Sequence, residues 1–176
     1  MNSYRFRCYY EKSGTGVFIS IRNLQKLIER SLRRLDIPLK FTEGFSPHPK
    51  LSFCPPLPVN IAGTNEYFDF FVTTMVDETA FVKQICPFLP EGICFKKIKF
   101  IQDGISSPAN NGIYAVYTIE HNDVSEEILM GFGEVIENNR QKAKILIKIN
   151  NFSHKPMLSL LYEKKVKKIS REVIGI

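Results

Sequence analysis

The sequence predicts an α+β protein. Segments rich in Tyr, Phe and Ile alternate between apolar and polar residues, which is typical of β-strands. One segment instead repeats its apolar residues at spacings of three and four, which indicates an amphipathic α-helix. Strand-like and helix-like segments follow one another in a mixed order, so the two kinds of element belong to the same folding units.

Six elements are predicted in the first hundred residues. A Ser-Gly-Thr-Gly turn at 13–16 separates the first strand from the first helix, for which Ser20 is a suitable N-cap. The strands are expected at 4–10, 51–54, 66–73 and 93–101, and the helices at 21–35 and 77–87. Strand, helix, strand, strand, helix, strand is the ferredoxin-like order, with both helices on one face of an antiparallel sheet. We therefore predict a ferredoxin-like domain over residues 1–101.

A Gly-, Ser-, Pro- and Asn-rich stretch at 102–112 predicts a linker, and residues 113–176 predict a second, smaller α+β unit. Asp123 or Ser125 caps a helix that is expected to reach about residue 138. The other expected elements are strands at 113–120, 142–149 and 165–174 and a short helix at 156–162. A complete ferredoxin-like unit has four strands. Either one strand is too short to detect, or this second ferredoxin-like unit is degenerate.

The helix at 21–35 carries two stripes. Its apolar stripe is expected to be buried, and its second stripe is basic and about 16 Å long. Glu29 is the single acid among these cations, although repeated like charges four residues apart oppose helix formation slightly. The stripe therefore predicts an anionic partner, unless it is simply a solvated face. Its cations are Arg22, Lys26, Arg30, Arg33 and Arg34.

Charge is divided unevenly along the chain. The formal net charge is +6 overall, made of +6 in residues 1–60, −8 in residues 61–138 and +8 in residues 139–176. Such polarity favours binding to a polyanion or an acidic partner, although basic residues also keep exposed faces soluble. Any nucleic-acid footprint is expected to avoid residues 61–138, and Arg5, Arg7, Tyr9 and Phe45 are candidates for stacking on unpaired bases.

A proline-rich loop at 41–58 is the most unusual segment of the chain. His48 lies between two prolines and close to Lys50, so a rigid loop presents both side chains for phosphate binding or acid–base chemistry. The alternative is that His48 only braces the loop through hydrogen bonds. The candidate loop residues are Glu43, Gly44, Phe45, Pro47, His48 and Pro49.

Several chemistries lack their usual sequence signals. No apolar run approaches the roughly 18 residues that a membrane span needs, and the first residues do not resemble a secretion signal, so we expect a cytoplasmic protein. The four cysteines have no metal-site spacing, and we expect free, mostly buried thiols. Neither a nucleotide-binding Gly-Lys-Ser/Thr loop nor a nucleophile motif is present. We therefore expect no metal and no cofactor.

The first half resembles a known family. The segments Phe18-Ile-Ser20, Glu29–Arg34, Glu43–Phe53 with its Pro-His-Pro-Lys core, and Glu66–Asp69 are similar to the uncharacterised radical-SAM-linked domain, which occurs alone or fused C-terminally to radical SAM proteins. The similarity covers most of residues 4–100. It implies an association with a radical SAM protein. This chain lacks the three closely spaced cysteines of a radical SAM centre, so it would act as an accessory.

The chain departs from the family pattern at three positions. The family places His-x-Asp after the serine, where this sequence has Ile21 and Asn23, and it places Gly where this sequence has Asn60. If that His and Asp were catalytic, this chain would be inactive. If they only shape the start of the helix, Asn23 could make part of the same hydrogen bonds.

Three functions follow as hypotheses. The first is a non-catalytic accessory module of a radical SAM system that binds RNA (tRNA or rRNA) through the basic helix, Lys50 and the proline-rich loop. The second is a protein-interaction module that docks on the radical SAM enzyme. The third is an RNA-cleaving or RNA-modifying enzyme that uses His48.

Overall fold

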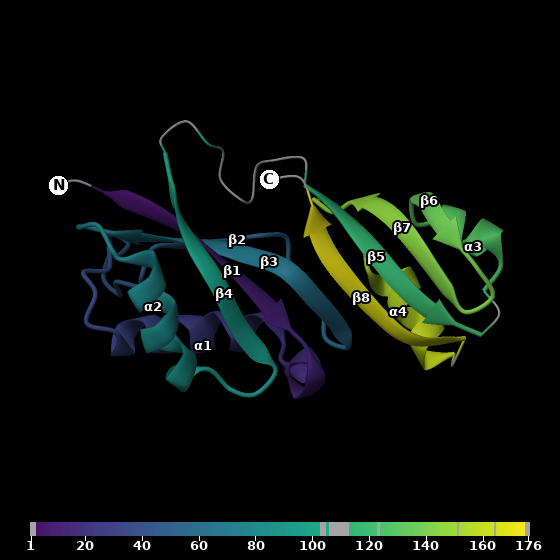
Figure 1. The fold of residues 1–176 in the computed structure, drawn as a ribbon, viewed down its shortest axis with the longest axis horizontal. Helices are drawn as coiled ribbons and strands as arrows, with labels where there is room; N and C mark the ends of the chain where they lie inside the picture. The colour runs from purple at the N-terminus through teal and green to yellow at the C-terminus, as the bar shows by residue number, and fades with distance from the viewer. Residues whose placement is uncertain are drawn as a thin grey trace.

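The computed structural model describes residues 3–102, 105, 113–122, 124–150, 152–163 and 165–174. Over these residues the protein is a mixed α+β fold with eight strands in one sheet and four α-helices (Figure 1). The first half contains β1 (Tyr4–Lys12), α1 (Ile21–Arg34), β2 (Leu51–Phe53), β3 (Ile61–Val72), α2 (Glu78–Ile85) and β4 (Ile93–Ile101). The second contains β5 (Tyr114–His121), α3 (Glu126–Met130), β6 (Glu134–Asn138), β7 (Lys142–Lys148), α4 (Lys155–Tyr162) and β8 (Val166–Ile174).

The first-half strands lie in the order β4-β1-β3, with the short β2 on the far side of β3, and all these pairs are antiparallel. α1 and α2 cover the same side of this sheet in Figure 1. Phenylalanines on alternate positions of the strands fill the space beneath the helices, and Phe70 stacks on Phe81 of α2 with ring centroids 5.0 Å apart. The alternation seen in the sequence is therefore a two-faced sheet with one aromatic, helix-covered face.

α1 begins and ends near the residues that its pattern predicts. The Ser20 side chain accepts a hydrogen bond from the Asn23 backbone N–H at 3.3 Å, which caps the first turn. Leu24, Ile28 and Leu32 are at most 1% exposed and pack against the sheet. Burial of this stripe fixes the rotation of the helix, so its basic side faces outward.

The second half corrects the sequence prediction. The helix expected to run from Asp123 or Ser125 to residue 138 is only α3, Glu126–Met130, and residues 134–138 form the strand β6 instead. Gly131 and Gly133 directly follow the helix. A Cβ at Gly133 would clash with the Leu146 carbonyl oxygen of β7, so only glycine fits there. The second half therefore has four strands, in the order β8-β5-β7-β6.

The two halves are joined through the sheet. β3 and β8 pair in parallel, with Ile61 opposite Ile169 and Gly63 opposite Arg171, which makes the eight strands continuous. Figure 1 shows β8 beside β3 at the centre of the molecule, with the remaining strands spreading to either side. The linker predicted at 102–112 lies almost wholly outside the described residues.

The described helices are all too short or too polar to cross a membrane. The four cysteines are free thiols, and the expectation that they are mostly buried holds for half of them: Cys8 and Cys54 are buried, whereas Cys86 and Cys94 are exposed. Burial raises the pKa of the Cys54 thiol to about 12, so this thiol is held in its neutral form.

Candidate nucleic-acid interface

The basic stripe of α1 is exposed, as its spacing predicts, but it does not form one continuous surface. Lys26, Arg30 and Arg34 line a groove between α1 and the 3-10 helix η2 (Cys86–Phe88). We call this the α1 groove; it has a volume of about 410 Å³, and its lining is Asn23, Lys26, Leu27, Arg30, Ser31, Arg34 and Phe88. Spacings of four residues keep these three cations on one side of the helix.

Both walls of the α1 groove are held in place. The Ser31 hydroxyl, which is buried, donates a hydrogen bond to the Phe88 carbonyl at 3.2 Å and so ties the helix to η2. The Arg34 guanidinium lies 5.6 Å from the centroid of the Phe88 ring. An aromatic ring therefore lies beside the row of positive charges.

The three groove cations lack a carboxylate partner among the described residues. Several other exposed cations do have such partners: Arg33 with Glu29, Lys96 with Glu11, Lys144 with Glu137, and Lys165 with Glu163. The α1 groove therefore gathers positive charge that no described carboxylate neutralises, at a small cost to the helix.

Arg33 belongs to a different cluster, on the side of α1 that faces the proline-rich loop. Its guanidinium donates to the Glu29 carboxylate and to the Pro47 carbonyl, at 3.1 and 3.2 Å, and lies 5.0 Å from the centroid of the Phe41 ring. His48 Nδ1 is 3.0 Å from the same Glu29 oxygen. Contact with His48, followed by Arg33, lowers the pKa of Glu29 although partial burial opposes the shift.

These contacts brace the base of the loop. His48 and Thr42 also exchange hydrogen bonds, from the His48 N–H to Thr42 Oγ1 at 3.1 Å and from the Thr42 N–H to the His48 carbonyl at 2.8 Å. Beyond this base, Gly44 has φ near 126° and the side chain of Phe45 is fully exposed. The loop therefore presents Glu43, Gly44 and Phe45 at its tip, while Pro47, His48 and Pro49 form its anchored side.

The structure separates Arg22 and Lys50 from both clusters. Arg22 lines a hollow with Cys54, Pro55 and Pro56, about 490 Å³ in volume. The Lys50 ammonium lies 4.8 Å from the centroid of Phe71. Phe71 neighbours the helix-facing Phe70 along β3 and so points to the opposite face of the sheet. The six cations predicted as one site therefore belong to four environments.

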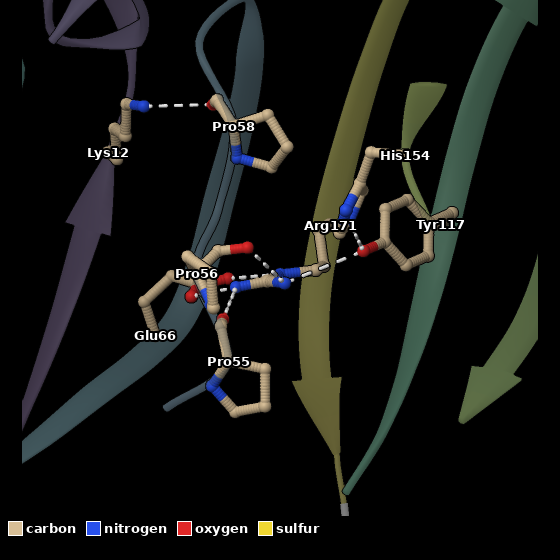
Figure 2. Close-up of polar contacts among 8 residues, drawn as sticks. All are labelled: Lys12, Pro55, Pro56, Pro58, Glu66, Tyr117, His154 and Arg171. Carbon is tan, nitrogen blue, oxygen red and sulfur yellow. Dashed lines mark hydrogen bonds and ion pairs between the residues drawn. The ribbon is translucent and has the colours of Figure 1, made fainter. Parts of the chain in front are cut away.

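Some cations that contribute to the basic ends of the sequence are buried. Figure 2 shows Arg171 of β8 reaching across the joint between the halves to Glu66 of β3. Its Nε donates to Glu66 at 2.7 Å, Nη2 contacts the second carboxylate oxygen, and Nη2 also donates to the Pro55 carbonyl at 3.0 Å. Arg171 and Glu66 are each 1% exposed. Burial opposes the charge of Arg171, but Glu66 more than offsets this and raises its pKa.

The same network includes two neutral groups. The Tyr117 hydroxyl lies 3.5 Å from Arg171 Nη1 and 2.6 Å from His154 Nε2 (Figure 2). Burial, aided by the charge of Arg171, lowers the pKa of His154 to about 4 and keeps its ring neutral. His154, to which the sequence assigns no role, is thus part of the joint between the halves.

Lys12 is buried in the same region, where its ammonium donates to the Pro58 carbonyl at 3.0 Å (Figure 2). Burial lowers the pKa of Lys12 to about 8, and the charge of Glu66 limits the fall. Gly63 leaves space for Glu66, because an added Cβ would lie 2.8 Å from Glu66 Cγ. This charged cluster holds the Pro55–Pro58 segment over β3 and β8.

A second buried ion pair corrects the expectation for Arg7 and also engages Arg5. Both arginines contact the Asp69 carboxylate, Arg7 Nε at 2.8 Å. Arg7 is 1% exposed and its guanidinium stacks over the Tyr67 ring, and Tyr9 is only partly exposed beneath Lys97. Arg7 is therefore structural and cannot stack on unpaired bases.

Segments near the two ends of the chain meet in a place that the sequence does not predict, and the cations there come only from the C-terminal segment. Lys167 and Lys168 at the start of β8 line a hollow with the 3-10 helix η1 (Gly14–Phe18), which directly precedes α1. Asn60 also lines this hollow, with φ near 65°. This left-handed conformation is one that Gly and Asn tolerate best, so Asn60 suits a position where the resemblance implies Gly.

Comparison with known families covers nearly the whole chain. The model of DUF2344, described as an uncharacterized protein conserved in bacteria, matches residues 5–174. The chain belongs to the DUF2344 family. No curated protein matches it. Among solved structures, this DUF2344 protein is similar to the acetolactate synthase small subunit from Thermotoga maritima, at 15% identity over 100% of this chain and 97% of that chain, with a TM-score of 0.28.

Sequence reasoning missed the buried charges of this DUF2344 protein, although a signal was present. Glu66 and Asp69 lie in the aromatic strand EYFDFF, where an acid needs a cation once the strand is buried on both faces. The register of the paired strands decides which cations lie beside Glu66 and Asp69. The pairs Arg7–Asp69 on neighbouring strands and Gly63–Arg171 across the joint became visible only in the fold.

Proposed function

We propose that this protein is a non-catalytic accessory module that binds RNA through the α1 groove. The observation that carries the proposal is the row of Lys26, Arg30 and Arg34 in one groove, without a carboxylate partner among the described residues. Phosphates of a nucleic-acid backbone supply the missing negative charge. Phe88 at the same groove offers an apolar ring for a sugar or base.

The length of the row supports a backbone contact rather than binding of a single anion. Lys26 and Arg34 are eight residues apart, which corresponds to about 12 Å along a helix. That distance exceeds one phosphate group and spans roughly two nucleotides of an RNA strand. Arginine at two of the three positions favours forked hydrogen bonding to phosphate oxygens.

The test is retention of tRNA and rRNA fragments on filters at several salt concentrations. We expect the triple variant Lys26→Ala/Arg30→Ala/Arg34→Ala to bind RNA about tenfold or more weakly than the parent. The slope of log affinity against log salt concentration should also become less steep, by about two to three released counterions. A matched control removes Lys142, Lys148 and Lys155, which are exposed in the second half and carry the same total charge. Equal losses in both variants would show only a general charge effect and would contradict the proposal.

The protein-interaction hypothesis has one specific observation in its favour. Phe45 is a fully exposed aromatic residue at the tip of a loop whose base is braced by Glu29, Arg33 and His48. A rigidly presented aromatic side chain is the usual anchor of a protein interface. Capture of a radical SAM protein that survives nuclease and high salt, and that Phe45→Ser abolishes, would favour this function over RNA binding.

The catalytic hypothesis rests on His48 alone. Its contacts with Glu29 and Thr42 join the loop to α1, and bracing accounts for all of them. His48→Ala that still folds provides the test: RNA cleavage or modification present in the parent and absent from this variant would establish a catalytic role.

We propose further that each half is a ferredoxin-like unit. The support is the repeated sheet order, β4-β1-β3-β2 in the first half and β8-β5-β7-β6 in the second, with the same strand and helix succession in both. A joint formed by β3 and β8 then presents surfaces of both units to one ligand.

A further inference from the structure

We propose that the hollow at the joint between the two halves binds an unpaired nucleotide of the RNA. We call it the junction hollow; η1, the start of β3, the end of α4 and the start of β8 surround it, and its volume is about 540 Å³. This volume lies within the range of small-molecule sites in proteins. The inference rests on the proposed RNA binding and specifies what kind of RNA is recognised.

Two aromatic rings lie at the junction hollow. Phe18 ends η1 and Tyr162 ends α4, and each is 72% exposed. Because both rings are so exposed, a ligand in the hollow can reach them. The side chains of Phe18 and Tyr162 make no hydrogen bond or ring contact with any described residue. The faces of such rings accept nucleobases of any sequence by stacking.

Two cations lie beside these rings. Lys167 and Lys168 are exposed in the hollow, and no ion pair to a described residue engages them. Nearby Lys165 does pair with Glu163, at 2.8 Å, and Glu120 lies opposite Lys168 in the β5–β8 register without forming an ion pair. Ring faces for a base and ammonium groups for a phosphate together match the two chemical parts of a nucleotide.

The floor of the hollow is rigid. Ala62 and Ile169 lie on β3 and β8, the two strands that pair across the joint. Asn60 has a left-handed conformation, and its backbone N–H donates a hydrogen bond to the Val17 carbonyl at 2.9 Å, which fixes η1 above β3. A base that enters between these elements meets prearranged walls, whereas a stacked duplex has no free base to insert.

The experiment compares a five-nucleotide single-stranded RNA with tRNA by fluorescence anisotropy at low salt. For Phe18→Ala/Tyr162→Ala we expect about tenfold weaker binding of the pentanucleotide, because stacking on aromatic rings contributes that much per base. Lys167→Ala/Lys168→Ala should weaken it similarly and reduce its salt dependence. The single variant Tyr162→Phe keeps both aromatic rings and should bind the pentanucleotide as tightly as the parent protein.

The outcomes separate the two proposals. If the aromatic double variant binds the pentanucleotide as the parent does, or if the parent does not bind it, the junction hollow is not a nucleotide site. Loss of tRNA in the α1 groove variant would still support the proposed function. If the α1 groove variant keeps tRNA while the aromatic variant loses the pentanucleotide, the groove proposal is wrong and the junction hollow stands. Circular dichroism of each variant verifies folding, since the four changed side chains are exposed.

Discussion

Replacing Arg171 with Met tests whether the buried ion pair holds the two halves together. The change keeps most of the apolar stem but removes every donor that reaches Glu66 and the Pro55 carbonyl. Glu66 is 1% exposed, so its carboxylate remains out of water without its main partner. Breaking a buried pair from one side costs about 3–5 kcal/mol in free energy of unfolding. That is a large part of the roughly 5–15 kcal/mol that stabilises a typical domain.

A double-mutant cycle identifies the pair as the cause. Glu66→Gln alone leaves the Arg171 guanidinium buried and uncompensated, whereas the double variant removes both charges. We expect the double variant to be at least about 2 kcal/mol more stable than the sum of the two single losses predicts, because contacting charged residues couple. Lys12 reduces the single loss of Arg171→Met somewhat, since its ammonium lies close enough to Glu66 for their charges to interact.

The assay is urea unfolding at pH 7, followed by far-UV circular dichroism. Lys165→Met is the control, because it removes an ion pair whose two side chains are each about half exposed, and such pairs contribute little. A loss below about 1 kcal/mol for Arg171→Met, or strictly additive effects in the cycle, would refute the role assigned to the pair.

Three further predictions concern the same joint. The pKa of Lys12 is about 8 in the folded protein and 10.5 in the unfolded chain, so the unfolded chain binds more protons between these pH values. The free energy of unfolding should therefore rise with pH across this range, by up to about 3 kcal/mol relative to the Lys12→Met variant. Parallel curves of urea midpoint against pH for the two proteins would contradict this. Gly63→Ala should cost about 1–3 kcal/mol in urea unfolding, because the new Cβ would lie 2.5 Å from Leu57 Cδ2 and 2.9 Å from Glu66 Oε1, and no loss would mean that both side chains move aside freely. Asn60→Gly should unfold at the temperature of the parent in calorimetry, whereas Asn60→Val should lose about 1–2 kcal/mol at φ near 65°; equal melting of the two variants would argue against a left-handed residue there.

Local patterns in the sequence determined most of the elements. The spacing of Leu24, Ile28 and Leu32 placed α1 to within a residue or so, and Ser20 marked its start, because helix caps and apolar stripes are written in neighbouring residues. Strand-like patterns likewise placed β1 and β4, and the prolines on either side placed β2, whereas β3 begins at Ile61, five residues before its predicted start. β6 was missed because a five-residue strand directly after a short helix is too short for its alternation to be distinguished from the pattern of a longer helix.

The sequence by itself determined that the α1 stripe is basic and faces outward, since burial of the opposite stripe leaves no other rotation. Only the tertiary structure decided which cations are available. Arg7 and Arg171 count as surface charge in any sequence sum, yet strand register places them beside Asp69 and Glu66. The reason is physical: an amphipathic stripe depends on residues a few positions apart, whereas a buried ion pair depends on strands brought together from distant parts of the chain.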